Sequence, residues 1–339
     1  MSKQFPDIGQ MHTLTLSLAC GDYDRTRAVF DGRSPIDGCT IIPLAMPPEE
    51  AFPRALKHQS FDISELSMAS HMTQVDRGQN GYVAVPVFLS RLFRHSSIYI
   101  RRDRGIARPE DLKGRLVGVP EYQITAAVWV RGILQDEYGL HPSDLRWRSG
   151  GLEQAGRTPS VSLNLPDQVD VAPIPGDDTL TAQLDRGDID ALVSAMPPSC
   201  LKTNPAVGRL FQDYRKVETD YFKKSGIFPI MHLVGIRKRL VEEHPWLPFN
   251  VFRAFAKAKE LCYARLETLG HLYTTLPWPV DELERTREIM GQDYWRYGVA
   301  ENRKEIDALA RYLQEQGLTA RRLTAEDLFH PSTFSIPKL

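Results

Sequence analysis

The segment that constrains this chain most is RPEDLKGRLVGVPEYQITAAVWVRGIL, at residues 108–134. It reads as a turn, a short buried strand at 115–119, a loop at 120–125 and then a helix. The loop brings hydroxyl, amide and free backbone N–H groups to the helix N-terminus. Because that end of a helix carries partial positive charge and unpaired donors, it suits a carboxylate or another anion.

This strand–loop–helix pattern resembles the second lobe of type II periplasmic-binding-protein-like folds, in which two lobes close on a small anion. The resemblance implies an α/β protein with mixed sheets, a ligand cleft between the lobes and a helical C-terminal region. The first lobe is expected to be discontinuous, at 1–103 and 215–339, and the second to cover 104–214. At 339 residues the chain is long enough for two such lobes.

Apolar alternation and turn signals place further elements on both sides of this segment. Strands are expected at 14–19, 41–44, 82–89, 97–101, 189–194 and 228–236, with another that begins at 61 and runs into a Ser-rich turn. Helices are expected at 49–57, 180–187 and 301–316, and the last has the apolar spacing of one buried face. The span 150–178 is expected to be irregular around one short strand.

The charge balance and the N-terminus narrow the class of partner. With 42 Lys+Arg against 43 Asp+Glu, the chain has no bias toward nucleic acid or an acidic membrane. No stretch is long and apolar enough to span a bilayer. The first twenty residues hold one lysine and a short, interrupted apolar run, unlike a secretory signal, so a cytoplasmic location is expected. A homo-oligomer stays open, through the helical C-terminal third or the apolar residues around Trp246 and Trp278.

Polar residues at strand ends and helix starts are the site candidates, because a two-lobed fold points such positions toward its cleft. They are Tyr23, Arg25 and Arg27; Glu65, Ser67, Ser70 and His71; Arg91, Arg94, His95 and Ser96; Tyr122, Gln123 and Thr125; and His232. Four arginines exceed what a monocarboxylate requires, and guanidinium groups bind paired carboxylates well, so we expect a small di-anion as ligand.

Each candidate also has a structural interpretation. Arginines near strand ends are often solvated surface charge, and Arg25 and Arg27 alternate, so at most one of them is expected to face the cleft. His232 lies in an apolar strand and fits a core residue, while Tyr122 and Thr125 could simply cap the helix.

Motifs of several other chemistries are missing from the sequence. We find no histidine spacing typical of a metal site, no nucleotide-binding glycine pattern and no Gly-x-Ser-x-Gly elbow. The four cysteines lie far apart and are expected to be buried free thiols. No protein-bound metal is expected.

Three blocks are similar to the 4,5-dihydroxyphthalate decarboxylase family: CGDYDRT at 20–26, FDISELS at 61–67 and PVFLSRLFRHS at 86–96. DLKGRLVGVPEY at 111–122 and PIMH at 229–232 also resemble it. The resemblance runs from about Leu14 to Leu328, and SRLFRHS and YDRT are its most specific parts.

The resemblance implies loss of CO2 from an aromatic dicarboxylate that bears ring hydroxyls, such as 4,5-dihydroxyphthalate, in aromatic compound catabolism. A hydroxyl para to the leaving carboxylate can push electrons into the ring, so that the ring carbon is protonated and CO2 leaves. The hydroxylated ring is its own electron sink, so no cofactor is expected. A divalent metal ion chelated by the two hydroxyls of the substrate is left open.

Chemistry then suggests roles for the candidates. His232 or His95 would protonate the ring carbon, since histidine titrates near working pH, and Glu65 or Tyr122 would handle the phenolic proton. Arg91 and Arg94, with Arg25 or Arg27, would hold the carboxylates, and Thr125 with the helix N-terminus would clamp one of them. Tyr23 and Ser67 complete the expected substrate-binding set.

Three alternatives stay open at this point. A non-catalytic solute-binding protein for an aromatic or small carboxylate would share the clamp but predicts export. A cytoplasmic ligand sensor would need an output domain, and the sequence has no recognisable one. A different lyase or hydrolase could act on another hydroxylated aromatic acid, since function belongs to the site rather than the fold.

Overall fold

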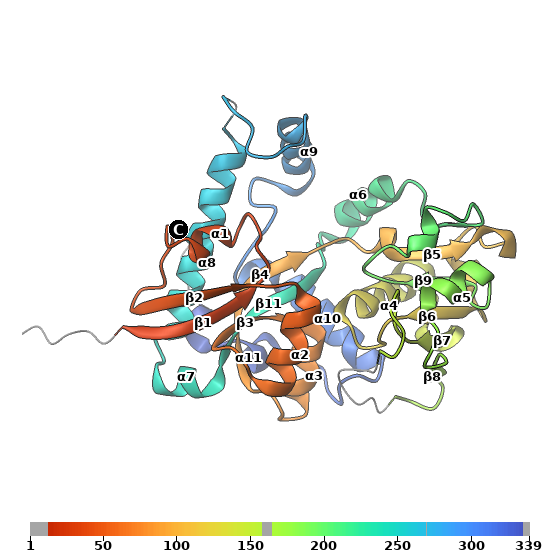
Figure 1. The fold of residues 1–339 in the computed structure, drawn as a ribbon, viewed down its shortest axis with the longest axis horizontal. Coiled ribbons are helices and arrows are strands. Elements are labelled where there is room, and N and C mark those ends of the chain that lie inside the picture. Colours follow the sequence, from red (N-terminus) through yellow and green to blue (C-terminus); the bar gives the residue numbers. More distant parts are fainter. Residues whose placement is uncertain (1–12, 158–164, 269, 335–339) are drawn as a thin grey trace, which may run out of the picture.

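The computed structural model describes residues 13–157, 165–268 and 270–334, and it arranges them in two α/β lobes, each built on one mixed sheet (Figure 1). The first sheet has the order β2-β1-β3-β11-β4. Its strands are β1 (Leu14–Cys20), β2 (Cys39–Ala45), β3 (Ile63–Ser67), β4 (Tyr82–Arg91) and β11 (Ile230–Arg237). β1 lies parallel to β2 and β3, whereas β11 runs antiparallel between β3 and β4.

The second sheet has the order β10-β5-β9-β6-β7-β8. Its strands are β5 (Ile98–Arg101), β6 (Leu116–Val119), β7 (Arg146–Ser149), β8 (Val171–Pro173), β9 (Ala191–Val193) and β10 (Val207–Arg209). The two mixed sheets confirm the predicted fold class, and β8 is the short strand expected within 150–178.

One predicted lobe boundary differs from the structure. The strand expected at 97–101 was placed in the first lobe, but β5 pairs antiparallel with β9 and β10 of the second sheet. The second lobe therefore begins before residue 98 rather than at residue 104. The sequence pattern of a short apolar strand does not reveal which sheet it joins, because that depends on its pairing partners.

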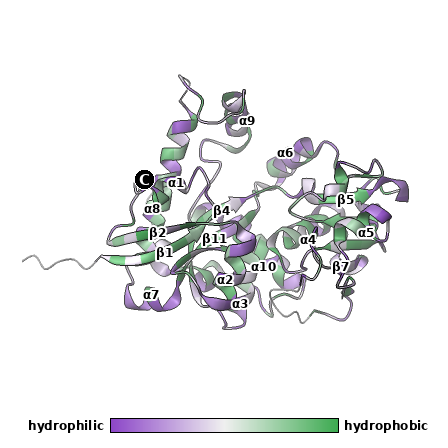
Figure 2. Ribbon diagram, in the orientation of Figure 1, coloured by the Kyte–Doolittle hydropathy of each residue, from purple (hydrophilic) through white to green (hydrophobic). Residues whose placement is uncertain are grey.

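Helices pack around both sheets, and Figure 2 shows that several of them, such as α6 and α9, are largely hydrophilic. They are α1 (Arg27–Phe30), α2 (Pro48–His58), α3 (Met68–Asp76), α4 (Thr125–Tyr138), α5 (Leu180–Arg186), α6 (Tyr214–Ser225), α7 (Lys238–Glu243), α8 (Leu247–Leu266), α9 (Pro279–Met290), α10 (Arg303–Glu315) and α11 (Ala325–Leu328). Among the described residues, the structure contains no helix with the length and apolarity needed to cross a membrane.

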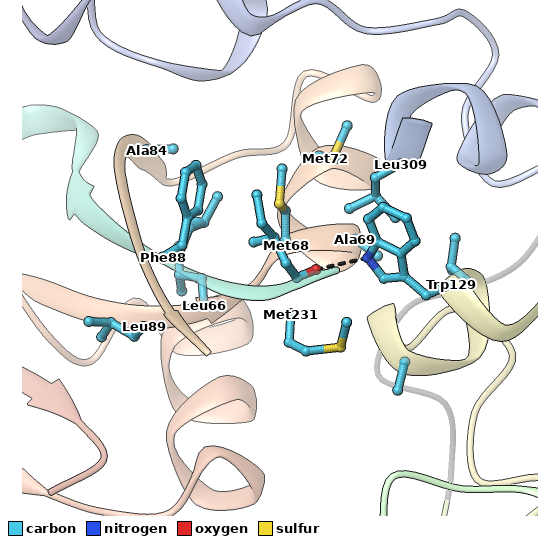
Figure 3. Packing of buried hydrophobic residues seen from close by; sticks show 14 of the residues in the cluster. Leu66, Met68, Ala69, Met72, Ala84, Phe88, Leu89, Trp129, Met231 and Leu309 are labelled. Carbon is cyan, nitrogen blue, oxygen red and sulfur yellow. Dashed lines mark hydrogen bonds between the residues drawn. The ribbon is translucent and has the colours of Figure 1, made fainter. Parts of the chain in front are cut away.

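The lobes share one continuous core rather than meeting only at a flexible hinge. Trp129 of α4 is fully buried, and its indole N–H donates to the carbonyl of Ile230 at 2.9 Å (Figure 3). The ring of Tyr312 on α10 lies edge-on to Trp129 with centroids 5.5 Å apart. Gly132 makes this packing possible, because a Cβ there would lie 2.4 Å from the Tyr312 ring. The predicted buried face of α10 thus fixes α4 against the first lobe.

Candidate active site

The candidate site lies at the carboxyl ends of the parallel strands of the first sheet. Because β1, β3 and β4 are parallel and β11 is antiparallel to them, the ends of β1 and β3 meet the start of β11 here. His232 pairs with Ser67 across the β11–β3 ladder, and Glu65 is two residues before Ser67 on the same face. Residues far apart in the sequence are therefore brought together here by strand order.

The carboxylate of Glu65 is the centre of the hydrogen-bond network. Its side chain is fully buried and accepts from His232 Nδ1 at 2.7 Å, from the Tyr23 hydroxyl at 3.0 Å and from the Gly21 backbone N–H at 3.0 Å. Burial alone would raise the pKa of Glu65, but the hydrogen bond and charge of His232, with the other two donors, outweigh it and hold the pKa below its ordinary value. Burial and the charge of Glu65 raise the pKa of Tyr23. Glu65 is thus ionised and Tyr23 is its neutral donor.

His232 is oriented by this carboxylate. With Nδ1 bound to Glu65, its Nε2 has no hydrogen-bond partner in the described parts of the chain, and 18% of its side chain is exposed. The ring of Phe52, from α2, lies edge-on to the imidazole with centroids 4.8 Å apart. A carboxylate on Nδ1 fixes the orientation of the ring, so Nε2 is the nitrogen that can meet a bound molecule.

Ser67 and Thr125 join the two lobes beside His232. Their hydroxyl oxygens lie 3.0 Å apart, and Thr125 Oγ1 also accepts from the Ala69 N–H at 3.0 Å. Ser67 is the N-cap of α3, and Thr125 is the first residue of α4. Hydroxyls and amide donors from two helix N-termini thus converge near the imidazole, as an anion-binding region requires.

The pH dependence of stability gives a test of the Glu65 network. A carboxylate whose folded pKa is lowered stabilises the protein above the ordinary Glu value of 4.5 and loses that effect as pH falls through the folded pKa. We expect Glu65→Gln to melt below the wild type at neutral pH, and the difference to shrink below pH 4.5. Thermal unfolding over a pH series measures this, and a difference independent of pH would contradict an ionised Glu65.

Two of the four candidate arginines have roles other than the expected one. Arg27 is exposed at the surface, where it pairs with Asp22 at 3.1 Å. Arg91 is buried and donates to the carbonyls of Phe228 and Arg296, to Glu305 and to Asn302. The expectation that Arg91 holds a ligand carboxylate does not fit this placement, since both terminal nitrogens of its guanidinium donate to protein groups and only the buried Nε has no partner among the described residues.

Arg25 faces inward, as the alternation with Arg27 allowed for one of the pair. Its guanidinium lies between the rings of Tyr23 and Trp295, each centroid 4.3 Å away, and donates to the Leu89 carbonyl at 2.8 Å. It also pairs with Asp24 at 3.2 Å. Arg25 therefore contacts the Glu65 network through Tyr23.

Arg94 differs from the other buried arginines. It is 5% exposed, and it donates to Met231 Sδ at 3.1 Å and to Ser97 Oγ at 3.5 Å. Within the described ranges no carboxylate lies within 4.0 Å of it, and burial lowers its pKa to about 10. Met231 precedes His232, so a buried cation without a close anion lies at the strand end that carries the imidazole. Such a cation is costly unless an anion joins it.

His95 and Tyr122 are placed in apolar surroundings instead of at the site. His95 is buried against the rings of Phe211 and Tyr221, and this burial lowers its pKa to about 4. The ring of Tyr122 lies under the Arg131 guanidinium at 3.6 Å, inside the second lobe. Neither placement suits the proton-transfer roles that we expected, and in both cases the strand or loop pattern left the side-chain direction undetermined.

Sequence reasoning missed Phe52 and Trp295, which contact His232 and Arg25. Phe52 lies in an amphipathic helix that we predicted only as a covering element. Trp295 follows α9, and no local pattern links residue 295 to a loop at residue 25. Only the tertiary arrangement shows these contacts.

The described cavities lie elsewhere. One of about 460 Å³ is bordered by Arg33, Arg253 and Lys257, and one of about 200 Å³ by Arg265, His271 and Tyr273. Neither includes a candidate site residue, so the ligand cleft between the lobes stays a prediction. In the described parts of the chain, no group of three or more His, Cys, Asp or Glu side chains is arranged to hold a metal ion.

Comparisons with known proteins bear on the identity of this site. No family model matches the chain. It is 43% identical over 330 residues to the 4,5-dihydroxyphthalate decarboxylase of Comamonas testosteroni, which covers 97% of this chain and 100% of that protein. It is 45% identical over 214 residues to the enzyme of the same name from Pseudomonas putida, covering 63% of this chain and 83% of that protein.

Solved structures show the same fold at low identity. The aliphatic sulphonate binding protein SsuA of Escherichia coli matches with a TM-score of 0.53 and 14% identity, over 94% of this chain and 98% of that one. The sulfonate-binding SsuA of Methylobacillus flagellatus matches with a TM-score of 0.54 and 13% identity, over 94% of this chain and 92% of that one. These similarities confirm the binding-protein-like fold.

Proposed function

Because the chain belongs to the 4,5-dihydroxyphthalate decarboxylase family, we propose that it removes CO2 from 4,5-dihydroxyphthalate or a close relative at the Glu65–His232 site. The chain is an aromatic-acid decarboxylase, a carbon–carbon lyase. The observation that carries the assignment of the site is the imidazole of His232, oriented through Nδ1 by a buried carboxylate at 2.7 Å, with no partner for Nε2 among the described residues.

The reaction exchanges a carboxylate for a proton on one ring carbon. The oxygen of the para hydroxyl donates electron density into the ring, and the ring carbon forms a bond to the proton of His232 Nε2. The bond to the carboxylate then breaks, its electron pair restores aromaticity, and CO2 leaves. The neutral imidazole regains a proton from solvent before the next turnover, so the single proton consumed is accounted for.

Glu65 acts through His232 in this proposal. Both of its oxygens accept hydrogen bonds from Gly21, Tyr23 and His232, so it is a positioning residue and does not touch the substrate. This changes the role expected from the sequence, in which Glu65 handled the phenolic proton. The hydrogen bond from Nδ1 to this carboxylate fixes the orientation of the ring, so that Nε2 is the nitrogen that meets the substrate.

Two sets of donors are proposed to hold the carboxylates of the substrate. Arg94 supplies a buried charge with no carboxylate of the described residues within 4.0 Å, although Glu218 lies near enough to act on it electrostatically, and a substrate carboxylate would be its close anion. Ser67 and Thr125 supply hydroxyls from both lobes; one hydroxyl proton is used in the bond between them, which leaves the other to donate to a carboxylate, while the Ala69 N–H holds Thr125 Oγ1 in place. A di-anion suits this arrangement because the two sets come from separate parts of the junction.

The solute-binding alternative fits these observations less well. Binding a carboxylate requires donors, but it does not require an imidazole held by a buried, triply hydrogen-bonded carboxylate. Such an arrangement suits proton transfer.

The experiment that tests the function measures CO2 release and the ultraviolet change of 4,5-dihydroxyphthalate with purified protein, with and without a chelator. We expect turnover that survives chelation, because the hydroxylated ring accepts the electrons. Activity lost to the chelator and restored by a divalent ion would instead place an ion on the substrate hydroxyls. Phthalate, which lacks those hydroxyls, is the control and is expected to release no CO2.

The cytoplasmic location and a homo-oligomeric state are also proposals. All four cysteines are free thiols, which is usual in a reducing compartment. Cell fractionation and light scattering of the purified protein test the two statements.

A further inference from the structure

A guanidinium between two rings links the C-terminal region to the candidate site. Arg25 follows the loop that leaves β1, and Trp295 lies between α9 and α10. The Cζ atom of Arg25 lies 4.3 Å from the centroid of the Tyr23 ring and 4.3 Å from that of the Trp295 ring. Since a guanidinium is planar, such stacking restricts both rings at once.

Trp295 is itself held by several hydrogen bonds. Its indole N–H donates to the Phe88 carbonyl at 2.8 Å, and its backbone N–H donates to the Tyr263 hydroxyl at 3.0 Å. Its carbonyl accepts from Lys259 Nζ at 3.2 Å, and Lys259 pairs with Asp293 at 2.6 Å. The tryptophan therefore presents a fixed surface to the guanidinium.

The stack ends at the group that orients the imidazole. Arg25 is anchored to the Leu89 carbonyl at 2.8 Å, so its guanidinium contacts the Tyr23 ring from a fixed position. The hydroxyl of that ring donates to Glu65 at 3.0 Å, and Glu65 accepts from His232 at 2.7 Å. A continuous chain of contacts runs from Trp295 to His232.

We propose that Trp295 and Arg25 are positioning residues that act on His232 through Tyr23 and Glu65, and that Arg25 does not hold a substrate carboxylate. The proposal rests on the proposed role of His232 as proton donor. It explains why an arginine beside the site is stacked and bonded to a carbonyl when the ligand is expected to be an anion.

A double-mutant cycle tests the proposal. We expect Trp295→Leu and Tyr23→Phe each to lower kcat for 4,5-dihydroxyphthalate by roughly tenfold with little change in KM, because a misplaced acid slows chemistry more than binding. The double variant is expected to lose no more than the worse single variant, since both changes break one chain. Losses that multiply, or a raised KM with kcat unchanged, would overturn the proposal.

Two further variants keep the test decisive. Arg25→Lys retains the charge but has no planar group to stack on the two rings. Its kcat is therefore expected to fall as far as that of Tyr23→Phe, and this can be measured even if Trp295→Leu fails to fold. Trp278→Leu removes a tryptophan that is 75% exposed, and it is expected to leave kcat unchanged. An Arg25→Lys protein with full kcat would overturn the proposal.

A spectroscopic measurement separates this inference from the proposed function. In ¹⁵N-labelled protein without substrate, at one fixed pH, His232 is expected to show an Nδ1-protonated signature that Arg25→Lys and Tyr23→Phe both weaken. If the wild type releases no CO2, the proposed function fails, but this signature still decides the inference. A His232 signal that neither variant changes would overturn it.

Discussion

Replacing His232 with Gln is expected to lower kcat for 4,5-dihydroxyphthalate by roughly 10²–10⁴-fold, the usual effect of losing a general acid. Glutamine can still donate to Glu65, so the buried carboxylate keeps a partner and the fold should persist. It cannot deliver a proton from the position of Nε2. KM is expected to change much less than kcat, because substrate carboxylates are held by other residues.

The buried His95 provides the matched comparison. His95→Phe places an apolar ring between Phe211 and Tyr221, where the histidine Nδ1 has no partner among the described residues, and activity is expected to persist. Steady-state kinetics of both variants distinguish the two histidines. A folded His232→Gln protein with wild-type kcat, or a selective loss in His95→Phe, would exclude His232 as the acid.

Replacing Arg94 with Met is expected to weaken substrate binding while leaving the empty protein as stable as the wild type or more so. Loss of a charged hydrogen bond to a carboxylate corresponds to about 1.5–3 kcal/mol, or roughly 10- to 150-fold in Kd. Removing a buried cation that lacks a nearby anion relieves its desolvation cost, and replacing such charges by apolar groups is often neutral or stabilising. Isothermal calorimetry gives the affinity, and denaturant unfolding without ligand gives the stability.

Arg91, three residues earlier in the chain, is the control for this prediction. It is equally buried, but Glu305, Asn302 and two carbonyls bind its donors. Arg91→Met is therefore expected to destabilise the protein, toward the lower end of about 3–5 kcal/mol because Arg296 still pairs with Glu305 at 3.2 Å. If Arg94→Met instead destabilises the protein similarly and leaves Kd unchanged, Arg94 is a structural residue.

Several strands and helices of the first lobe could be predicted from the spacing of apolar residues along the sequence. Alternating leucines indicated the strand that became β1, and the apolar residues around His232 indicated β11. The same pattern gave the buried face of α10, because helical periodicity depends only on neighbouring residues. The assignment of β5 to a lobe failed, since strand pairing is a non-local property.

Some of the predicted site residues lie together in the structure and others do not, because side-chain direction, like strand pairing, depends on tertiary structure. Tyr23, Glu65, Ser67, Thr125 and His232 were all expected near the ligand, and the structure brings them together. Arg91, Arg94 and His95 belong to one sequence block, yet they enter three different environments. A strand end followed by a tight turn changes side-chain direction at each residue, so adjacency in sequence does not give a shared surface.

The sequence by itself determined many of the strands and helices, the α/β class and, through its motif blocks, the family of the chain; β7, β10, α1 and α6 were not predicted. The predicted features follow from periodicity, turn residues and the identity of short segments, all of which are local. The tertiary structure alone decided which polar groups have partners. Glu65 accepts hydrogen bonds from three donors, Arg91 pairs with Glu305, Arg25 contacts the Trp295 ring, and Arg94 has no carboxylate within 4.0 Å among the described residues. Whether a polar side chain has a hydrogen-bond or ion-pair partner depends on strand order and on contacts between distant segments. A side chain whose polar atoms are all bonded within the protein supports the fold, whereas one with an unbonded polar atom can act on a substrate.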